Sequence, residues 1–149
     1  MIFLKIGDLE FPEDLYYYPE HHIWLKQEED KVKVGMDAFG QKIAGKILFV
    51  RLRPAGKATN VGKTFGTLET GKWVGPLKSP VAGTIAEANP AVKDNPSLVN
   101  DDPYGEGWLL LVEPASLDAD LAPLIKGSDQ DAITKWIEEE QQKYADKLE

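Results

Sequence analysis

The sequence predicts a mainly β fold, either a compact barrel or a sandwich, with a short internal helix and a C-terminal helix. Three observations support this prediction. Between Tyr16 and Val112 the segments of β-type composition are short, and Gly, Pro and Asn separate them. A chain of 149 residues suits one domain whose core is large enough to fold without disulfides or metals. The tail from Glu113 differs in composition and contains a helical pattern.

The first segment, residues 1–15, is predicted to form an N-terminal arm. Its apolar residues alternate between Phe3 and Phe11, ahead of Pro12, as they would in an edge strand. We expect residues 16–149 to form one domain that includes the C-terminal helix.

Six strands are expected in the central region, each bounded by turn-forming residues. They cover His22–Lys26, Lys31–Met36, Lys46–Leu52, Thr64–Glu69, Gly83–Ala88 and Trp108–Val112. One helix interrupts them, from Asp37 to Ile43. Ala44-Gly45 is expected to close this helix, because glycine favours the helix C-terminus.

The C-terminal helix is expected over residues 129–147. Ser128, with Asp131 three residues later, resembles a capping box. The apolar residues that follow fall near one face of a helix: Ile133, Trp136, Ile137, Tyr144 and Leu148. From Glu113 onward ten acidic residues stand against four lysines. Such an acidic face is either a docking surface for a basic partner or, more commonly, a solvated outer face.

The composition excludes several classes of protein. The chain has no cysteine, which excludes disulfide frameworks, Cys-based zinc sites and thiol nucleophiles. No apolar stretch approaches the roughly 20 residues of a membrane helix, and the N-terminus lacks the features of a signal peptide. The formal net charge of −8 disfavours a nucleic-acid partner. We therefore expect a cytoplasmic protein with neither a membrane nor a nucleic-acid partner.

The most informative segment runs from Phe65 to Gly83 and holds Lys72 in a Gly-rich turn between two β-type stretches. Two extended segments bounded by Gly and Pro predict a hairpin. The tip of a hairpin holds its side chain away from the fold, while the paired strands fix its position. This geometry suits an enzyme that must attach a cofactor to one amine and to no other lysine.

Two other functions of a lysine in such a segment, nucleotide binding and biotin attachment, fit less well. Gly66 to Lys72 matches the first seven positions of the phosphate-binding loop G-x-x-x-x-G-K-[ST], but Trp73 stands where a hydroxyl must bind magnesium. Pro76 then interrupts the stretch that should open a helix. Biotin carriers as a family set the lysine between two methionines, whereas Gly71 and Trp73 flank Lys72, so biotin is disfavoured.

Three blocks of sequence resemble the H protein of the glycine cleavage system, and the resemblance as a whole covers residues 18–112. Tyr18 to Trp24 resembles Y-x-x-E-H-E-W, with Ile23 in place of a glutamate. The second block extends from Val34 to Ile47 and resembles V-G-I-T-x-x-A-Q-x-x-L-G-D-I, with Lys46 in place of an aspartate. The third extends from Leu98 to Leu109 and is close to L-V-N-x-x-P-Y-G-E-G-W-L throughout.

The resemblance implies a biotinyl/lipoyl-type hybrid barrel-sandwich that carries lipoate on Lys72 and has no catalysis of its own. Glu69 aligns with a glutamate that the family keeps ahead of its lysine, whereas Gly71 and Trp73 depart from the usual E-S-V-K-A. These three flanking residues are expected to take part in recognition of the attachment site. In the family the lipoyl arm also rests in a surface cleft, and Trp73 is expected to alter that resting site.

The implied partners are a lipoate ligase or transferase and three enzymes: glycine decarboxylase, aminomethyltransferase and lipoamide dehydrogenase. A monomeric carrier would take an aminomethyl intermediate between them on its lipoyl-lysine arm. Two alternatives stay open. The chain also resembles the lipoate-binding proteins of heterodisulfide-reductase-like sulfur oxidation, which carry sulfur to a heterodisulfide-reductase-like complex. The other alternative is a non-lipoylated binding module.

The two histidines are expected to be structural or surface residues. His21 and His22 are adjacent, so their side chains would point in different directions on a strand. No third ligand is apparent nearby, and a metal site usually needs three or four convergent ligands. We therefore expect no metal site.

The remaining polar and aromatic candidates also have structural interpretations. Asp101, Asp102 and Glu106 lie among a proline, a tyrosine and glycines, which predicts a turn whose acids bond to local backbone. Large aromatic side chains are expected to pack in the core or against the C-terminal helix: Trp24, Trp108 and Trp136.

Overall fold

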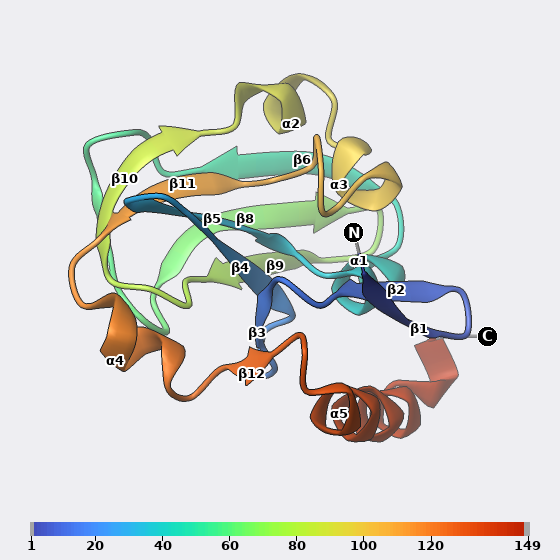
Figure 1. The fold of residues 1–149 in the computed structure, drawn as a ribbon. Coiled ribbons are helices and arrows are strands. Elements are labelled where there is room, and N and C mark those ends of the chain that lie inside the picture. Colours follow the sequence, from blue (N-terminus) through green and yellow to red (C-terminus); the bar gives the residue numbers. More distant parts are fainter. Residues whose placement is uncertain (1, 148–149) are drawn as a thin grey trace.

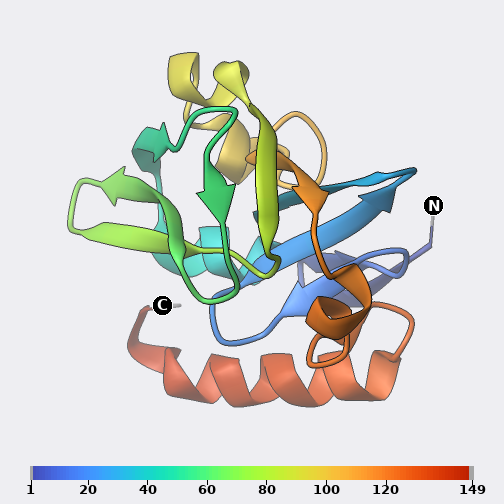
Figure 2. The same ribbon diagram turned by 90° about the vertical axis from the view of Figure 1, so that its left-hand side faces the viewer.

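The computed structural model describes residues 2–147, in which two antiparallel sheets pack face to face (Figures 1 and 2). The larger sheet has seven strands in the order β12-β3-β4-β5-β11-β10-β7, and the smaller has the order β6-β8-β9. A third sheet contains only β1 and β2. This mainly β arrangement, with an internal and a C-terminal helix, confirms the predicted fold class.

The seven-stranded sheet takes strands from both halves of the chain. It contains β3 (Tyr16–Tyr18), β4 (Ile23–Glu28), β5 (Lys31–Met36), β7 (Ala58–Thr59), β10 (Gly83–Ala88), β11 (Leu110–Pro114) and β12 (Ile125–Lys126). The three-stranded sheet contains β6 (Ile47–Leu52), β8 (Thr64–Thr70) and β9 (Val74–Lys78). The six predicted strands correspond to β4, β5, β6, β8, β10 and β11, with ends shifted by at most two residues. The two- and three-residue strands β3, β7 and β12 are too short to show a period in the sequence.

The main core lies between these two sheets. Leu25, Val32 and Val34 fill it from β4 and β5, and Phe65 and Leu68 fill it from β8. Each is at most 1% exposed, and full burial of a side chain of this size stabilises a fold by about 1.5–3 kcal/mol. The core therefore anchors the base of the β8–β9 hairpin, whose far end carries Lys72.

Helix α1 (Ala38–Ala44) connects the two sheets. Asp37 is its N-cap, and the Asp37 Oδ1 accepts a hydrogen bond of 2.8 Å from the Gly40 N–H. At the other end Gly45 has φ 78°, a left-handed conformation that glycine adopts at little cost. The predicted helix differs from α1 by one residue at each end, because Asp37 caps the helix without belonging to it.

A second core lies under helix α5 (Gln130–Lys143), which runs along the base of the molecule (Figure 2). Helix α5 contributes Ile133, Trp136 and Ile137 to this core, which confirms the predicted apolar face. The N-terminal segment reaches the same core through Phe11. That segment is a hairpin of β1 (Phe3–Ile6) and β2 (Leu9–Pro12), where the sequence suggested one edge strand. The boundary between arm and domain stays a prediction.

The C-terminal helix is shorter than predicted and has a different cap. It ends at Lys143, and a 3-10 turn, η1 (Ala145–Lys147), follows it. The capping-box prediction for Ser128 was wrong, because Asp129 is the N-cap and its Oδ1 accepts from the Ala132 N–H at 3.2 Å. Leu148, expected on the apolar face, lies outside the described residues.

Three further short helices were not predicted: α2 (Pro90–Asp94), α3 (Leu98–Asp101) and α4 (Leu117–Leu121). None exceeds five residues, which is too short for a helical period to appear in the sequence. Of the helices in residues 2–147, none combines the length and apolar character needed to cross a bilayer.

The three motif blocks meet at Trp24, the last residue of the first block. Its indole lies over Gly35, its cross-strand neighbour, where a Cβ would overlap the ring. The Trp24 Nε1–H donates to the Pro103 carbonyl at 3.0 Å. The predicted core position of Trp24 is confirmed, since it is 1% exposed.

Candidate functional site

Lys72 lies in the turn between β8 and β9, as the sequence predicts. The two strands pair in register, with Glu69 opposite Val74 in the last pair before the turn. The Lys72 side chain is exposed, whereas Leu68 of β8 and Leu77 of β9, farther from the turn, are buried. The hairpin is therefore rooted in the core and leaves the lysine at its tip.

Thr70 fixes the backbone on which Lys72 sits. Its Oγ1 accepts from the Lys72 N–H at 3.2 Å and from the Trp73 N–H at 3.3 Å. The Thr70 N–H also donates to the Trp73 carbonyl at 2.9 Å. Because Thr70 is only 7% exposed, these bonds are shielded from water and hold the turn in one conformation.

The two residues that flank Lys72 are held differently. A Cβ on Gly71 would meet nothing within 4 Å, so open space surrounds it. Trp73 is 37% exposed, and its ring lies against Gly75, where a Cβ would overlap the six-membered ring. Gly75 thus leaves the room that the Trp73 ring occupies, a relation between two positions that the sequence reading missed.

Glu69 points to the outer side of the smaller sheet. It pairs with Phe49 on one side and Val74 on the other. Phe49 is 56% exposed and Val74 is 62% exposed. The carboxylate therefore lies between two exposed apolar side chains, close to the tip of the hairpin.

A surface groove of about 710 Å³ adjoins Lys72. The C-terminal end of α1 forms one wall, the hairpin tip with Trp73 forms another, and Asp146 of η1 closes an end. The groove is lined by Lys42, Ile43, Ala44, Gly45, Lys46, Thr70, Gly71, Lys72, Trp73 and Asp146. Its walls thus combine apolar surface with three lysines and one carboxylate.

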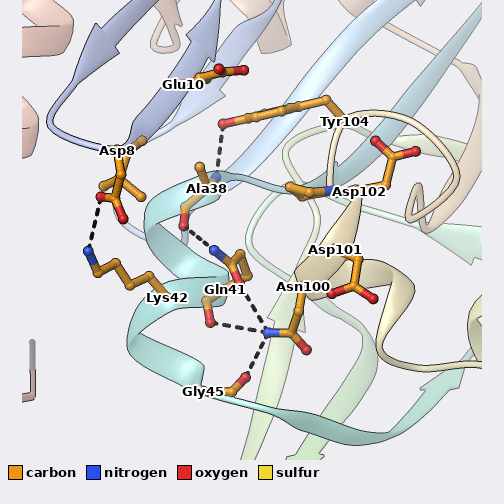
Figure 3. Close-up of a pocket in the computed structure, with 12 residues that line it drawn as sticks. Asp8, Glu10, Ala38, Gln41, Lys42, Gly45, Asn100, Asp101, Asp102 and Tyr104 are labelled. Atoms are coloured by element: carbon orange, nitrogen blue, oxygen red, sulfur yellow. Dashed lines mark hydrogen bonds and ion pairs between the residues drawn. The ribbon is translucent and has the colours of Figure 1, made fainter.

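Asn100 hydrogen-bonds to the segment that lines the groove at the end of α1. Its side-chain amide donates to the Gly45 carbonyl at 2.8 Å and to the Gln41 Oε1 at 3.0 Å, and its Oδ1 accepts from the Ile47 N–H at 3.0 Å. These bonds from one side chain fix the point where α1 ends and β6 begins, and Figure 3 draws those to Gln41 and Gly45. This role could not be predicted from local sequence, because Asn100 is more than fifty residues away from its partners.

A second hollow of about 470 Å³ lies between the β1–β2 turn, α1 and the segment from Asn100 to Tyr104, and Figure 3 shows the residues that line it. Asp8, Glu10, Asp101 and Asp102 border it, and the Tyr104 hydroxyl accepts from the Ala38 N–H at 2.9 Å. Lys42 forms an ion pair with Asp8 at 3.2 Å, which lowers the pKa of that carboxyl.

Of the three acids expected to bond to local backbone, Asp102 does so; no such bond is formed by the side chains of Asp101 and Glu106 within residues 2–147. The Asp102 Oδ2 accepts from the Glu106 N–H at 2.9 Å. Within residues 2–147 no group of three His, Cys, Asp or Glu side chains is placed to hold a metal ion.

His22 has a role that the sequence reading missed. The prediction that it lies on a strand was wrong: it precedes β4 and has φ 55°, which turns its side chain inward. Its Nδ1 lies 3.1 Å from Asp37 Oδ2, and its Nε2 lies 2.6 Å from Glu140 Oε1. A carboxylate beside each ring nitrogen favours the doubly protonated ring, because an ionised carboxylate only accepts hydrogen bonds and both nitrogens would then donate.

The His22 ring also joins α5 to the rest of the fold. It stacks on Trp136 at 5.0 Å between ring centroids and lies 5.0 Å from Phe39 of α1. Burial alone would lower the pKa of His22, but the two carboxylates outweigh it and raise the pKa above its ordinary value. This cluster fixes the helix that leads to Asp146 in the groove.

The comparisons with known proteins agree with one another. Residues 15–141 match the family model described as glycine cleavage H-protein. Glycine cleavage system H protein 2 of Aquifex aeolicus (strain VF5) is 43% identical over 131 residues, which cover 87% of this chain and 81% of the relative. H protein 3 of the same organism is 40% identical over 133 residues, which cover 86% and 83%.

A solved structure shows the same relationship. The crystal structure of a glycine cleavage system H protein from Mycobacterium marinum matches this fold with a TM-score of 0.73 at 29% sequence identity. The match covers 83% of this chain and 98% of that one. The family match over most of the chain, the identity above 40% and the shared fold together establish that the chain belongs to the glycine cleavage H-protein family.

Proposed function

We propose that this chain is a lipoyl carrier whose cofactor is attached to Lys72. The observation that carries the proposal is an exposed lysine on a hairpin tip that Thr70 holds in one backbone conformation. A fixed backbone lets an attaching enzyme recognise one amine by its position. The exposed side chain leaves that amine accessible.

The residues around Lys72 fit a lipoyl group. Trp73, Ile43 and Ala44 give the adjoining groove an apolar wall along which an acyl chain can lie. When bound, lipoate supplies a dithiolane whose disulfide accepts and releases a transferred group. The protein's contribution is to present the amine and to shelter the arm from water between visits to its partners. Tethering raises the effective concentration of the arm at whichever partner the domain has docked on.

The flanking residues have distinct parts in this proposal. Glu69 is the carboxylate beside the tip, offered to the attaching ligase or transferase between Phe49 and Val74. Gly71 presents bare backbone next to the lysine, because no side chain stands there. Trp73 forms the groove wall, so it sets where the arm rests.

The family match supports glycine cleavage as the pathway. As a glycine cleavage H protein, the chain would carry the aminomethyl group of glycine from glycine decarboxylase to the aminomethyltransferase. Lipoamide dehydrogenase would then reoxidise the arm. The protein is itself no enzyme in this scheme and acts as a monomer, and its cytoplasmic location stays a prediction.

The sulfur carrier of heterodisulfide-reductase-like oxidation is the second candidate. It is favoured by the departures from the family pattern next to the lysine, above all the Trp73 ring in the groove wall. Lys46 also lines that groove, in place of the aspartate usual in the family. Several of the similar relatives carry numbers as H proteins of one organism, so more than one role within the family is open to such copies.

The proposal is tested by lipoylation in vitro. The purified chain is incubated with a lipoate ligase, lipoate and ATP, and its mass is measured. We expect one lipoyl group on the wild type and on Lys46→Arg, the matched control from the same groove, and none on Lys72→Arg. Modification of Lys72→Arg, or no modification of the wild type, would contradict the proposal. If the Lys72→Arg variant also kept the protein's role in cells, the carrier hypothesis would fail and the non-lipoylated binding module would become the preferred function.

A further inference from the structure

The smaller sheet and its loops carry a charge opposite to that of the whole chain. Residues 46–78 contain seven cationic side chains and one carboxylate, that of Glu69, in a chain of net charge −8. The cations are Lys46, Arg51, Arg53, Lys57, Lys63, Lys72 and Lys78. Positive charge is therefore concentrated around the hairpin that ends in Lys72.

None of these seven cations has an ionic partner within residues 2–147. The ion pairs in that part of the chain belong to His22, Lys31, Lys33 and Lys42. Arg51 is exposed. An exposed cation without a partner acts over about a Debye length, roughly 8 Å at physiological ionic strength. The field of this lobe is thus available to an approaching molecule.

The register of the sheet defines one outer face. Phe49, Glu69 and Val74 form the row nearest the hairpin tip, and Arg51, Thr67 and Pro76 form the next row. Alternation along β6 and β9 leaves these residues outside, while the row Val50, Leu68 and Gly75 is buried. We call the two outer rows, together with Arg53, the outer face.

The row nearest the tip presents an open apolar side chain on each side of Glu69. Phe49 and Val74 are both more than half exposed, and Leu48 beside them is 41% exposed. Neighbouring apolar side chains left open in this way, with polar residues around them, mark interaction surfaces. An apolar centre with a charged rim is the usual anatomy of a protein interface.

We propose that the outer face is the docking surface for the enzymes that take the Lys72 arm, and that it fits a partner surface with an apolar centre and an acidic rim. The inference rests on the proposed function. Strands β8 and β9 run from this face directly to the turn that holds Lys72. An enzyme whose active site admits the arm therefore meets Phe49 and Val74 first and Arg51 next.

Two other occupants are less well matched to this face. A nucleic acid would bring phosphates against the Glu69 carboxylate in the row nearest the tip. A second copy of this chain could offer the acidic outer side of α5, but it would cover the hairpin that must stay open for modification. An enzyme surface with an apolar centre and an acidic rim matches both the cations and the apolar side chains of Phe49 and Val74.

Charge reversal tests the proposal. The probes are the purified aminomethyltransferase and lipoamide dehydrogenase of the same organism, titrated with the lipoylated chain by calorimetry. At about 50 mM salt we expect the Arg51→Glu/Arg53→Glu variant to bind at least about tenfold more weakly than wild type. The matched control is Lys126→Glu/Lys135→Glu, which changes the charge equally at exposed positions on β12 and α5, outside the lobe, and is expected to change affinity less than about threefold.

Salt and an apolar substitution separate the two parts of the surface. The effect of the double reversal is expected to shrink at about 500 mM salt, because exposed charges are then screened. Phe49→Ala is expected to weaken binding by a similar factor at both salt concentrations, because apolar burial is not screened. Circular dichroism of each variant checks that its fold is intact.

Several outcomes would overturn the proposal. They are an unchanged affinity of the Arg51→Glu/Arg53→Glu variant, no binding of either enzyme to the lipoylated wild type, tighter binding to a short DNA duplex than to the enzymes, and self-association that the reversal abolishes. The mass of each variant distinguishes this failure from failure of the carrier function. If the lipoylated chain binds its enzymes equally well with and without the outer-face substitutions, only the docking proposal is refuted. An unmodified Lys72 instead counts against the carrier function itself.

Discussion

The molecule holds its two most constrained polar sites in opposite ways. At His22 the side chain is fixed: it is 5% exposed, both ring nitrogens are bonded to carboxylates, and two aromatic rings pack against it. At Lys72 only the backbone is fixed, by the Thr70 hydroxyl, and the side chain is exposed. The fold thus specifies where the lysine begins and leaves its amine free, which is what an attachment site requires.

The two sites are also linked through α5. His22 holds Glu140 near the end of this helix, and η1 continues from there to Asp146 in the groove beside Lys72. A buried ionic cluster therefore positions one end of the surface on which an arm would rest. The contrast predicts large stability effects at His22 and small, local effects at the tip.

The largest effect is expected from His22→Ala. Removing the ring leaves the buried Asp37 carboxylate without its ion-pair partner and removes the stacking on Trp136. We therefore expect a loss of about 3–5 kcal/mol in the free energy of unfolding. His21→Ala is the matched control, with a loss of about 1 kcal/mol or less, because its ring packs only at the edge of Tyr18. Urea denaturation measures both. Equal losses in the two variants would show that the His22 cluster is not special.

The next effect is a pH dependence with a definite sign. The folded state raises the pKa of His22, so its stabilisation is fully present below the ordinary pKa of about 6.5 and is lost as pH rises through the folded pKa. The difference in unfolding free energy between the wild type and His22→Gln should therefore shrink as pH is raised from about 6 to 9. A difference that stays constant or grows over this range would contradict the ion-pair assignment.

At the tip, Thr70→Val is expected to have a moderate, local effect. It removes the acceptor of the Lys72 and Trp73 amides, so these amides should exchange with solvent faster, at a cost of about 1 kcal/mol to global stability. Thr70→Ser should keep the protection, and Thr67→Val, three residues earlier on β8 and on the outer face, should leave it unchanged. Unaltered exchange in Thr70→Val would mean that the strands alone hold the turn.

The smallest effect is expected at the glycines around the lysine. Gly75→Ala should push the Trp73 ring out of place and shift its indole NMR signal, with little change in stability because the ring can move into solvent. Gly71→Ala, where a Cβ has open space, should leave that signal in place. A shift of the same size in both variants would contradict the packing of Trp73 on Gly75.

The parts of this picture that could be predicted from sequence are those set by near neighbours. The Lys72 hairpin followed from glycines and a proline within a few residues, and α1 followed from Asp37 and Gly45 at its ends. The motif blocks supplied the family and hence the fold class. Even local signals failed where two candidates stood side by side, as with Ser128 and Asp129 at the start of α5.

The parts that could not be predicted depend on residues far apart in the chain. His22 meets Asp37 across 15 positions and Glu140 across 118, and nothing in the sequence pairs them. Its inward direction depends on a positive φ, whereas the sequence pattern suggested a strand. The groove beside Lys72 likewise forms only when α1, the hairpin and η1 come together.

The central claim is that Lys72 is the attachment site, and mass spectrometry of the protein purified from its native cells tests it most directly. We predict that the peptide containing Lys72 carries a lipoyl group and that no other lysine does. An aminomethyl adduct on that group would favour glycine cleavage, and a sulfur-bearing adduct would favour the sulfur carrier. An unmodified Lys72 in cells supplied with lipoate would contradict the account.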